Sequence, residues 1–272
     1  MKLPALFLGH GSPMNAIEAN SYARAWEALG QNLRAHYGSG IRAILAISAH
    51  WLTHGSAVTA MAKPRTIHDF GGFPQALFDM HYPAPGSPEI AAEIRALLGE
   101  DAVAADENWG LDHGTWGVLC HLFPDADVPV VQLSLNADFD ARQHFAFAQK
   151  LAALRERGIL IVASGNIVHN LRLMDWRHPE SADHPYPWAQ TAQTLVNGWL
   201  RDRNHAALTD EAAYPPELKL AAPTPEHFWP LLYIAAVQEA GEPLALFNDE
   251  IVGKSLSMTS VVVGGSGSLL PL

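Results

Sequence analysis

The chain has 272 residues, of which 49% are hydrophobic and 17% are charged, a composition that supplies enough apolar material for a substantial core. Its formal net charge of −11 argues against a nucleic-acid partner, because binding to a phosphate backbone rests on lysine and arginine. The single cysteine, Cys120, excludes an internal disulfide and a metal site built from cysteines.

The sequence gives no sign of targeting or of membrane insertion. The N-terminus opens directly into an apolar strand without the pattern of a signal peptide. No apolar run approaches the roughly 20 residues that a membrane-spanning helix needs. We therefore expect a cytoplasmic protein without a membrane partner, as a monomer or a homo-oligomer.

Apolar runs bounded by turn residues predict strands at 4–9, 43–48, 56–61, 129–134, 159–164, 244–247 and 258–264. Apolar residues at three- and four-residue spacing predict helices at 20–36, 88–99, 115–122, 139–157, 187–201 and 225–239. Strands and helices roughly alternate, which predicts an α/β fold: one domain over 1–272, with a largely parallel central sheet and helices on both faces. The stretch 64–88 is rich in proline, glycine and aromatic residues and lacks a period, so it predicts a long functional loop.

Several of the 14 histidines fall where predicted strands end. His10 stands between two glycines after the first strand, and His50 follows the second. His169 comes shortly after the strand 159–164. Because open α/β sheets bind ligands at the carboxyl ends of their strands, we expect the functional site at this edge.

Two further histidines lie where helices begin. His113 occupies a glycine-flanked turn before a predicted helix. His227 falls in the first turn of the helix 225–239, with Thr224 as N-cap and Pro225 at the first helical position. The positive end of that helix disfavours an imidazolium, so the ring of His227 should stay neutral and able to bind a metal.

Imidazole is a ligand that suits zinc and non-haem iron. Ligands delivered from separate strand ends are held by a rigid sheet, which suits a catalytic metal with open coordination positions. No local motif such as H-E-x-x-H occurs. The residues alone therefore leave two interpretations open, a dispersed histidine metal site and histidines that only cap turns.

The segments around these histidines resemble the class III extradiol ring-cleavage dioxygenases, and among them the 4,5-DOPA dioxygenase extradiol branch. The resemblance lies in the blocks LFLGHGSPMNAIE, ISAHW, IHDFGGFPQALF, HYPAPGSPEIA, GLDHGTWGVL, VPVVQLSLN, ASGNIVHNLR and TPEHFWPLLY. These blocks run from residue 5 to about residue 235, which is nearly the whole chain.

The resemblance implies one divalent non-haem metal per chain, with Fe(II) for turnover, and a catechol that O₂ opens beside one hydroxyl. It implies that His10, His50 and His227 bind the metal. His169 matches a histidine beside the metal that acts as acid/base or as a fourth ligand, and His113 matches a further catalytic histidine. We expect His169 to take a catechol proton and His113 to donate to the developing oxyanion. Zn(II) can fill the same set of imidazoles.

The third metal ligand has two candidates, because Glu226 and His227 are adjacent. The protocatechuate branch of the family uses a glutamate at this position. Neighbouring residues on a helix point about 100° apart, so only one of the two is expected to reach the metal. Glu226 also suits the first turn of a helix, and the resemblance to the DOPA branch favours His227.

The long loop contains His68 and Asp69, for which we expect substrate contact, with turn capping as the alternative. Two other functions stay open from the histidine pattern. One is a zinc-dependent hydrolase in which the metal activates water and His169 is the base. The other is a non-catalytic relative that uses the cleft for binding.

Overall fold

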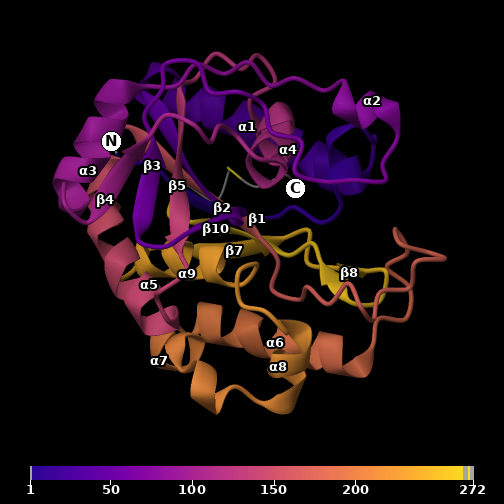
Figure 1. The fold of residues 1–272 in the computed structure, drawn as a ribbon. Coiled ribbons are helices and arrows are strands. Elements are labelled where there is room, and N and C mark those ends of the chain that lie inside the picture. The colour runs from indigo at the N-terminus through magenta and orange to yellow at the C-terminus, as the bar shows by residue number, and fades with distance from the viewer. Residues whose placement is uncertain (1, 266–268, 270–272) are drawn as a thin grey trace.

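The computed structural model describes residues 2–265 and 269. An eight-stranded sheet crosses it in the order β4-β3-β5-β2-β6-β1-β10-β7 (Figure 1). Its strands are β1 Ala5–Gly9, β2 Ala43–Thr53, β3 Ser56–Thr59, β4 Val103–Asp106, β5 Val130–Asn136, β6 Ile159–Gly165, β7 Leu244–Phe247 and β10 Ser260–Val263. A separate antiparallel pair is formed by β8 Ile251–Val252 and β9 Leu256–Ser257.

The middle of the sheet is parallel, and its edges are mixed. β5, β2, β6 and β1 run in one direction, whereas β10 pairs antiparallel to β1 and β3 pairs antiparallel to β5. The predicted largely parallel sheet is therefore confirmed. The parallel strands bring their carboxyl ends to one edge, where the histidines that follow them come close to one another.

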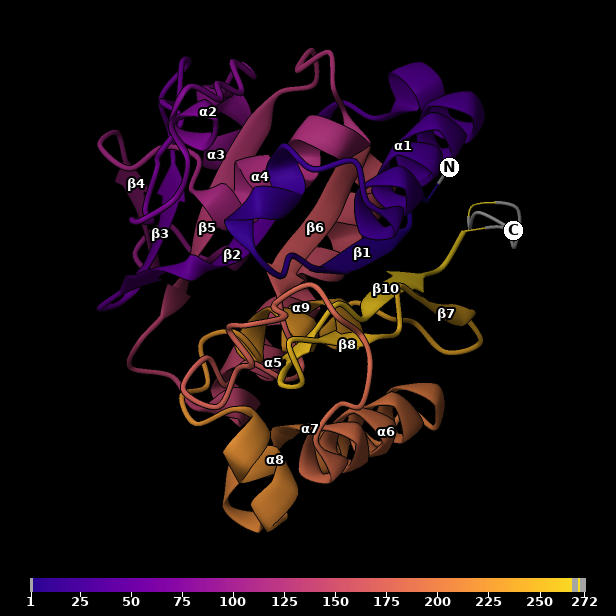
Figure 2. The same cartoon turned by 90° about the vertical axis from the view of Figure 1, so that its right-hand side faces the viewer.

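Helices cover both faces of this sheet (Figures 1 and 2). Alternate residues of a strand point to opposite faces, so Leu6 and Leu8 join one core while Ala5 and Phe7 join the other. The first core packs against α1 and α4, and the second against α3, α5 and α9, with α6, α7 and α8 as an outer layer. The helices are α1 Ser21–Tyr37, α2 Gln75–Phe78, α3 Pro88–Leu98, α4 His113–Leu122, α5 Ala141–Gln149, α6 Pro187–Arg201, α7 His205–Thr209, α8 Pro216–Ala221 and α9 Trp229–Ala236. No helix within the described residues is long and apolar enough to span a membrane.

Two predicted helices differ from the structure. The helix expected over 139–157 is α5 followed by a 3₁₀ helix, Lys150–Arg157, which ends at Gly158 in the left-handed conformation (φ 77°). The helix expected over 225–239 begins only at Trp229, and residues 226–228 form a turn. A proline at the second position of α9 fits a helix start there, because the first helical N–H groups need no partner. Pro225 suits a turn as well as the first position of a helix, and for this reason the predicted helix began too early.

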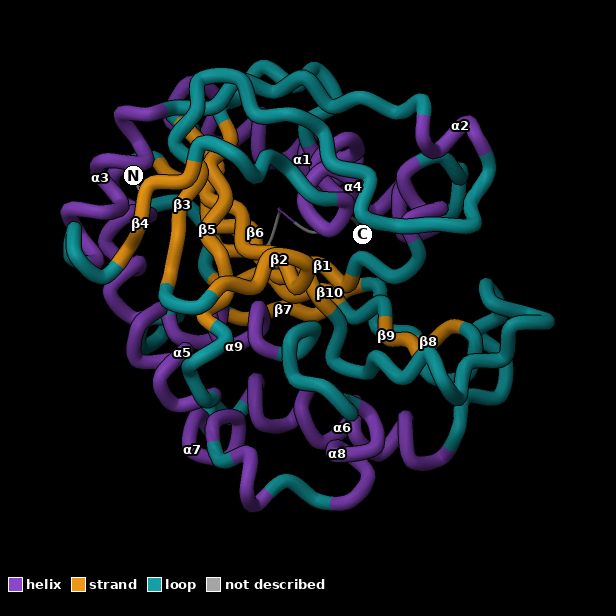
Figure 3. The backbone as a smooth tube through the Cα atoms, viewed as in Figure 1, coloured by secondary structure: helices purple, strands orange, loops and turns teal. Residues whose placement is uncertain are grey.

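Short elements account for the other differences. No predicted element corresponds to β4, β8, β9, α7 or α8, and the expected loop 64–88 contains the single-turn helix α2 (Figure 3). Elements of two to six residues carry too few periodic positions to reveal a hydrophobic face.

Arg155 is fully buried although it is charged. Its guanidinium donates to the carbonyls of Leu3 (2.8 Å) and Val237 (2.7 Å). It also makes a two-point ion pair with Glu242, at 2.7 and 2.9 Å. This side chain therefore ties the start of β1 to the end of α9 and to the turn before β7.

We expect Glu242→Gln to lower the free energy of unfolding by about 3 kcal/mol at pH 7, because it leaves a buried guanidinium without its counter-charge. Partial burial raises the pKa of Glu242, but hydrogen bonds from Arg155, the Glu239 N–H and Lys2 outweigh it and bring the pKa to about 2. This value lies below the unfolded value of about 4.3, so the stabilisation is complete above that pH and is lost as the pH falls towards 2. Urea unfolding of both proteins between pH 3 and pH 7 measures the difference.

Glu93→Gln is the matched control. Glu93 pairs with the exposed Arg42 (3.6 Å) and Arg157 (3.3 Å), and pairs of this kind contribute only about 0–1 kcal/mol. Equal losses from Glu93→Gln and Glu242→Gln would contradict the structural role of the buried pair.

Candidate metal centre

Three imidazoles from separate elements converge at the carboxyl edge of the sheet. His10 directly follows β1, His50 lies in β2, and His227 lies in the turn before α9. One ring nitrogen of each lies within 4.8 Å of the others. The closest pair is Nε2 of His10 and Nε2 of His50, 3.2 Å apart. The sheet thus places side by side three groups that are far apart in the sequence.

An irregularity in β2 accompanies the placement of His50. Ile47 of β2 pairs with Leu133 of β5, but the next pairs are Leu52 with Leu135, so β2 carries extra residues between them. Such bulges bend a strand and redirect its side chains, and they are frequent beside active sites. The sequence predicted a strand only to residue 48 because the run AILAIS ends there, whereas β2 continues past the bulge to Thr53.

Two glycines let neighbouring elements approach the cluster. A Cβ on Gly114 of α4 would lie 2.4 Å from the Ser48 Oγ and 2.8 Å from the His50 Cδ2. A Cβ on Gly165 of β6 would lie 2.3 Å from the carbonyl oxygen of His227. Any larger residue at these positions would push α4 or the His227 turn away from the sheet.

The outward ring nitrogens of the cluster have protein partners. Nδ1 of His10 lies 2.9 Å from the Ser164 Oγ, and Nδ1 of His227 lies 3.2 Å from the Glu226 Oε1. Nε2 of His227 is buried and has no hydrogen-bond partner among the described residues. Metal-bound histidines usually engage a hydroxyl or carboxylate through the second nitrogen, and an unpaired buried nitrogen is costly. The residues present therefore fit a divalent metal with nitrogen ligands.

Electrostatics keeps these imidazoles neutral, which is the form that binds metal. Burial, with a smaller effect of the neighbouring histidines, holds the pKa values of His10 and His227 well below the ordinary range. Burial and then His113 lower the pKa of His50 to about 3, although Asp69 acts in the opposite direction. All three rings are uncharged at neutral pH.

His169 lies directly against this cluster. It follows β6, and its ring stacks on that of His227 with centroids 3.5 Å apart and planes inclined by 6°. Ligand atoms of His169, Glu226 and His227 also lie within 4.8 Å of one another. Burial lowers the pKa of His169 to about 4, so its ring is neutral at pH 7 and can accept a proton. This geometry is compatible with an acid/base group and with a fourth ligand.

His113 and Asp69 complete the cluster. His113 is the first residue of α4, and its ring centroid lies 3.9 Å from that of His50. The carboxylate of Asp69 accepts the backbone N–H of His113 at 2.9 Å and lies 2.9 Å from its Nδ1. Its second oxygen lies 3.4 Å from Nδ1 of His50. Asp69 therefore bridges two histidines of the cluster, a contact that the sequence did not predict.

His68, the other loop residue singled out, contacts the protein interior. Its Nε2 lies 2.9 Å from the carbonyl oxygen of Met80, and its ring packs against Phe70 and Trp116. The substrate contacts expected of His68 and Asp69 stay predictions, and the contacts seen are with protein groups.

A buried carboxylate that sequence reasoning missed supports the start of α4. Asp112 is the N-cap of this helix, accepts the Thr115 N–H at 3.0 Å and contacts the amide of Gln132. Burial and then the charge of Asp69 raise its pKa. The Asp-x-x-Thr start of a helix was visible in the sequence, but the partner on β5 was not.

Two of the cavities lined by described residues touch the cluster. One, of about 10 Å³, lies beside His10 and His113. The other, of about 310 Å³, is lined by His169, Asn170, Leu171, Arg172, Pro223, Thr224 and Glu226. Only the second is large enough for part of a small organic ligand.

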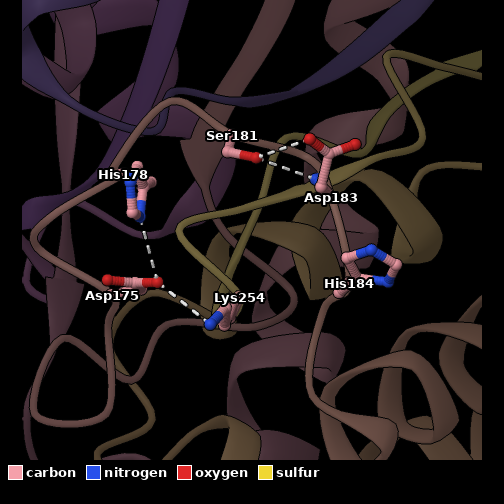
Figure 4. A pocket seen from close by; sticks show the side chains of 6 residues that line it. All are labelled: Asp175, His178, Ser181, Asp183, His184 and Lys254. Carbon is pink, nitrogen blue, oxygen red and sulfur yellow. Dashed lines mark hydrogen bonds and ion pairs between the residues drawn. The ribbon is translucent and has the colours of Figure 1, made fainter.

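A further cavity of about 300 Å³ lies outside the cluster (Figure 4). Asp175 lies between Lys254, at 3.0 Å, and His178, at 3.5 Å, while Ser181 donates to Asp183. Its acidic groups are thus already engaged within the protein, and none of the clustered histidines lines it.

Comparison with known proteins agrees with this geometry. Residues 4–263 match the family described as "Catalytic LigB subunit of aromatic ring-opening dioxygenase". The chain is 49% identical to the 4,5-DOPA dioxygenase extradiol of Escherichia coli K12, over 97% of this chain and 95% of that protein. It is 37% identical to the protein of the same name from Beta vulgaris, over 87% and 86% of the two chains.

A solved structure shows the same fold. It is the crystal structure of an uncharacterized protein from Escherichia coli K12, with a TM-score of 0.82 and 43% sequence identity. The match covers 97% of this chain and 100% of that one. The similarity confirms the predicted α/β fold class.

Proposed function

The chain belongs to the family of catalytic LigB subunits of aromatic ring-opening dioxygenases, and on that premise we propose that it opens the ring of a DOPA-like catechol with O₂. The observation that carries the proposal is the convergence of three neutral imidazoles, from His10, His50 and His227, in a chain of this family. Family membership also removes the support for a zinc hydrolase and for a non-catalytic relative.

Dioxygenases of this family use a non-haem metal. We assign His10, His50 and His227 as its ligands, one metal per chain, with Fe(II) for turnover and Zn(II) as an ion that the same nitrogens accept. When bound, the metal would supply the redox chemistry by which O₂ opens the catechol ring. The outward contacts with Ser164 and Glu226 fix the orientation of two of the rings.

The protein supplies proton transfer. His169 is neutral at pH 7 and stacks on His227, so its ring can take a proton from a catechol hydroxyl held at the cluster and later return it. Nδ1 of His113 lies 2.9 Å from the Asp69 carboxylate, and when both ring nitrogens carry a proton Nε2 can donate to the oxyanion that develops on the ring oxygen. Asp69 thus acts through His113 and His50 by holding their rings in place.

The name of the E. coli relative supports DOPA as the substrate class, because that protein is 49% identical over nearly the whole chain. We also propose that residues 1–272 form one catalytic domain, and the family match over residues 4–263 supports this proposal. A cytoplasmic location is a further proposal.

The test is O₂ uptake after anaerobic loading with Fe(II), measured against a panel of catechols that includes DOPA. We expect one O₂ consumed for each catechol lost, with DOPA among the best substrates, because a dioxygenase places both oxygen atoms in the product. Catechol loss without O₂ uptake, or no turnover of any catechol by metal-loaded protein, would contradict the proposal.

A further inference from the structure

The cavity beside His169 is the space into which a ring substrate can extend. Its wall includes His169 and Glu226, which group with His227 within 4.8 Å. The other cavity at the cluster, beside His10 and His113, holds only about 10 Å³, which is room for a water-sized group. Of these two cavities, the one of about 310 Å³ therefore has room for a substituent on a ring bound at the cluster.

One side of this cavity is cationic. Arg172 is the only lysine or arginine among its lining residues. The side chain is exposed, and within the described part of the chain it makes no hydrogen bond or ion pair. A guanidinium presents two parallel N–H donors that match a carboxylate. In a chain of net charge −11, an arginine without an acidic partner beside the cluster is suited to an anionic group of a ligand.

A second side is anionic. Oε1 of Glu226 accepts from the Thr224 Oγ1 at 2.8 Å and faces Nδ1 of His227 at 3.2 Å. Oε2 has no hydrogen-bond partner within residues 2–265, and the side chain is 24% exposed. This oxygen can accept from an ammonium group. Leu171 and Pro223 supply apolar parts of the cavity wall.

We propose that this cavity is the subsite for the substrate's side chain and that it selects a zwitterionic α-amino acid, whose carboxylate binds Arg172 and whose ammonium binds Glu226. The inference rests on the proposed ring-opening function, and it concerns the side chain of the substrate, which the histidine cluster does not hold. Both charges of an amino acid sit on one carbon, so a small cavity with one cation and one anion can satisfy both of them.

The experiment compares four catechols that share the ring and differ in the side chain: L-DOPA, 3-(3,4-dihydroxyphenyl)propionate, dopamine and 4-methylcatechol. For Arg172→Gln we expect kcat/KM for the two carboxylates to fall about tenfold relative to the two compounds without one, as expected for a lost charge-assisted pair at an exposed arginine. For Glu226→Gln the same relative loss should fall on L-DOPA and dopamine. Arg177→Gln removes a nearby exposed arginine that does not line the cavity, and it should leave all four ratios unchanged.

Binding without turnover gives a second measurement. Calorimetry on the zinc-loaded protein without O₂ should show L-DOPA binding more tightly than 4-methylcatechol, and Arg172→Gln should reduce that difference about tenfold. Equal losses for all four catechols, or no change in the ratios, would overturn the subsite. If the wild type consumes no catechol with O₂, the proposed function fails, whereas calorimetry still decides whether the cavity binds an amino acid.

Discussion

Replacing His227 with alanine is expected to empty most of the metal site and to abolish ring opening. The change removes one of three converging nitrogens, and Nε2 of this ring is buried without a hydrogen-bond partner among the residues that the structure describes. The loss of metal affinity should exceed the roughly 10–100-fold loss that follows removal of a group behind a ligand. Elemental analysis of the purified variant and titration with Zn(II) measure it.

Glu226→Ala is the matched control, because it changes the neighbouring residue in the same turn. It removes only the carboxylate behind Nδ1 of His227, so we expect the variant to keep close to one metal per chain with affinity lowered about 10–100-fold. The reverse result, with metal retained by His227→Ala and lost from Glu226→Ala, would make the third ligand a carboxylate. The chain would then lie nearer the protocatechuate branch, and DOPA would lose support as its substrate.

The sheet and the positions of the histidines along it were predictable because both depend on local patterns. Apolar runs ended by glycine and polar residues marked β1 and β6, and parallel pairing then brought His10 and the segment before His169 to one edge. Positions at strand ends and helix starts singled out five of the 14 histidines, and the family resemblance then implied the role of each.

The fine geometry of the site was not predictable, because it rests on long-range contacts. Asp69 bonds the backbone of His113 across 44 residues, from a loop whose proline and glycine content carries no period. The bulge in β2 depends on its pairing with β5, which the sequence of β2 alone does not contain. The start of α9 was misplaced because Thr224 and Pro225 suit a turn as well as a helix start.

His169→Gln separates the role of proton transfer from that of metal binding. If His169 is the acid/base group, the variant should keep its metal and lose turnover by a factor of about 10²–10⁴, because glutamine keeps a polar side chain but cannot exchange a proton. Single-turnover measurements on metal-loaded protein, with metal content determined on the same sample, give both quantities.

His144→Gln controls for the loss of a buried imidazole. Burial also lowers the pKa of His144 to about 4, but its ring lies against Trp229 and Tyr233, outside the cluster. We expect turnover per bound metal to stay at the wild-type level in this variant. If His169→Gln instead loses its metal, His169 is a fourth ligand, and the base must be sought elsewhere, with His113 as the next candidate. Asp69→Asn should then slow proton transfer, since the carboxylate on Nδ1 of His113 stabilises the ring that gains the proton.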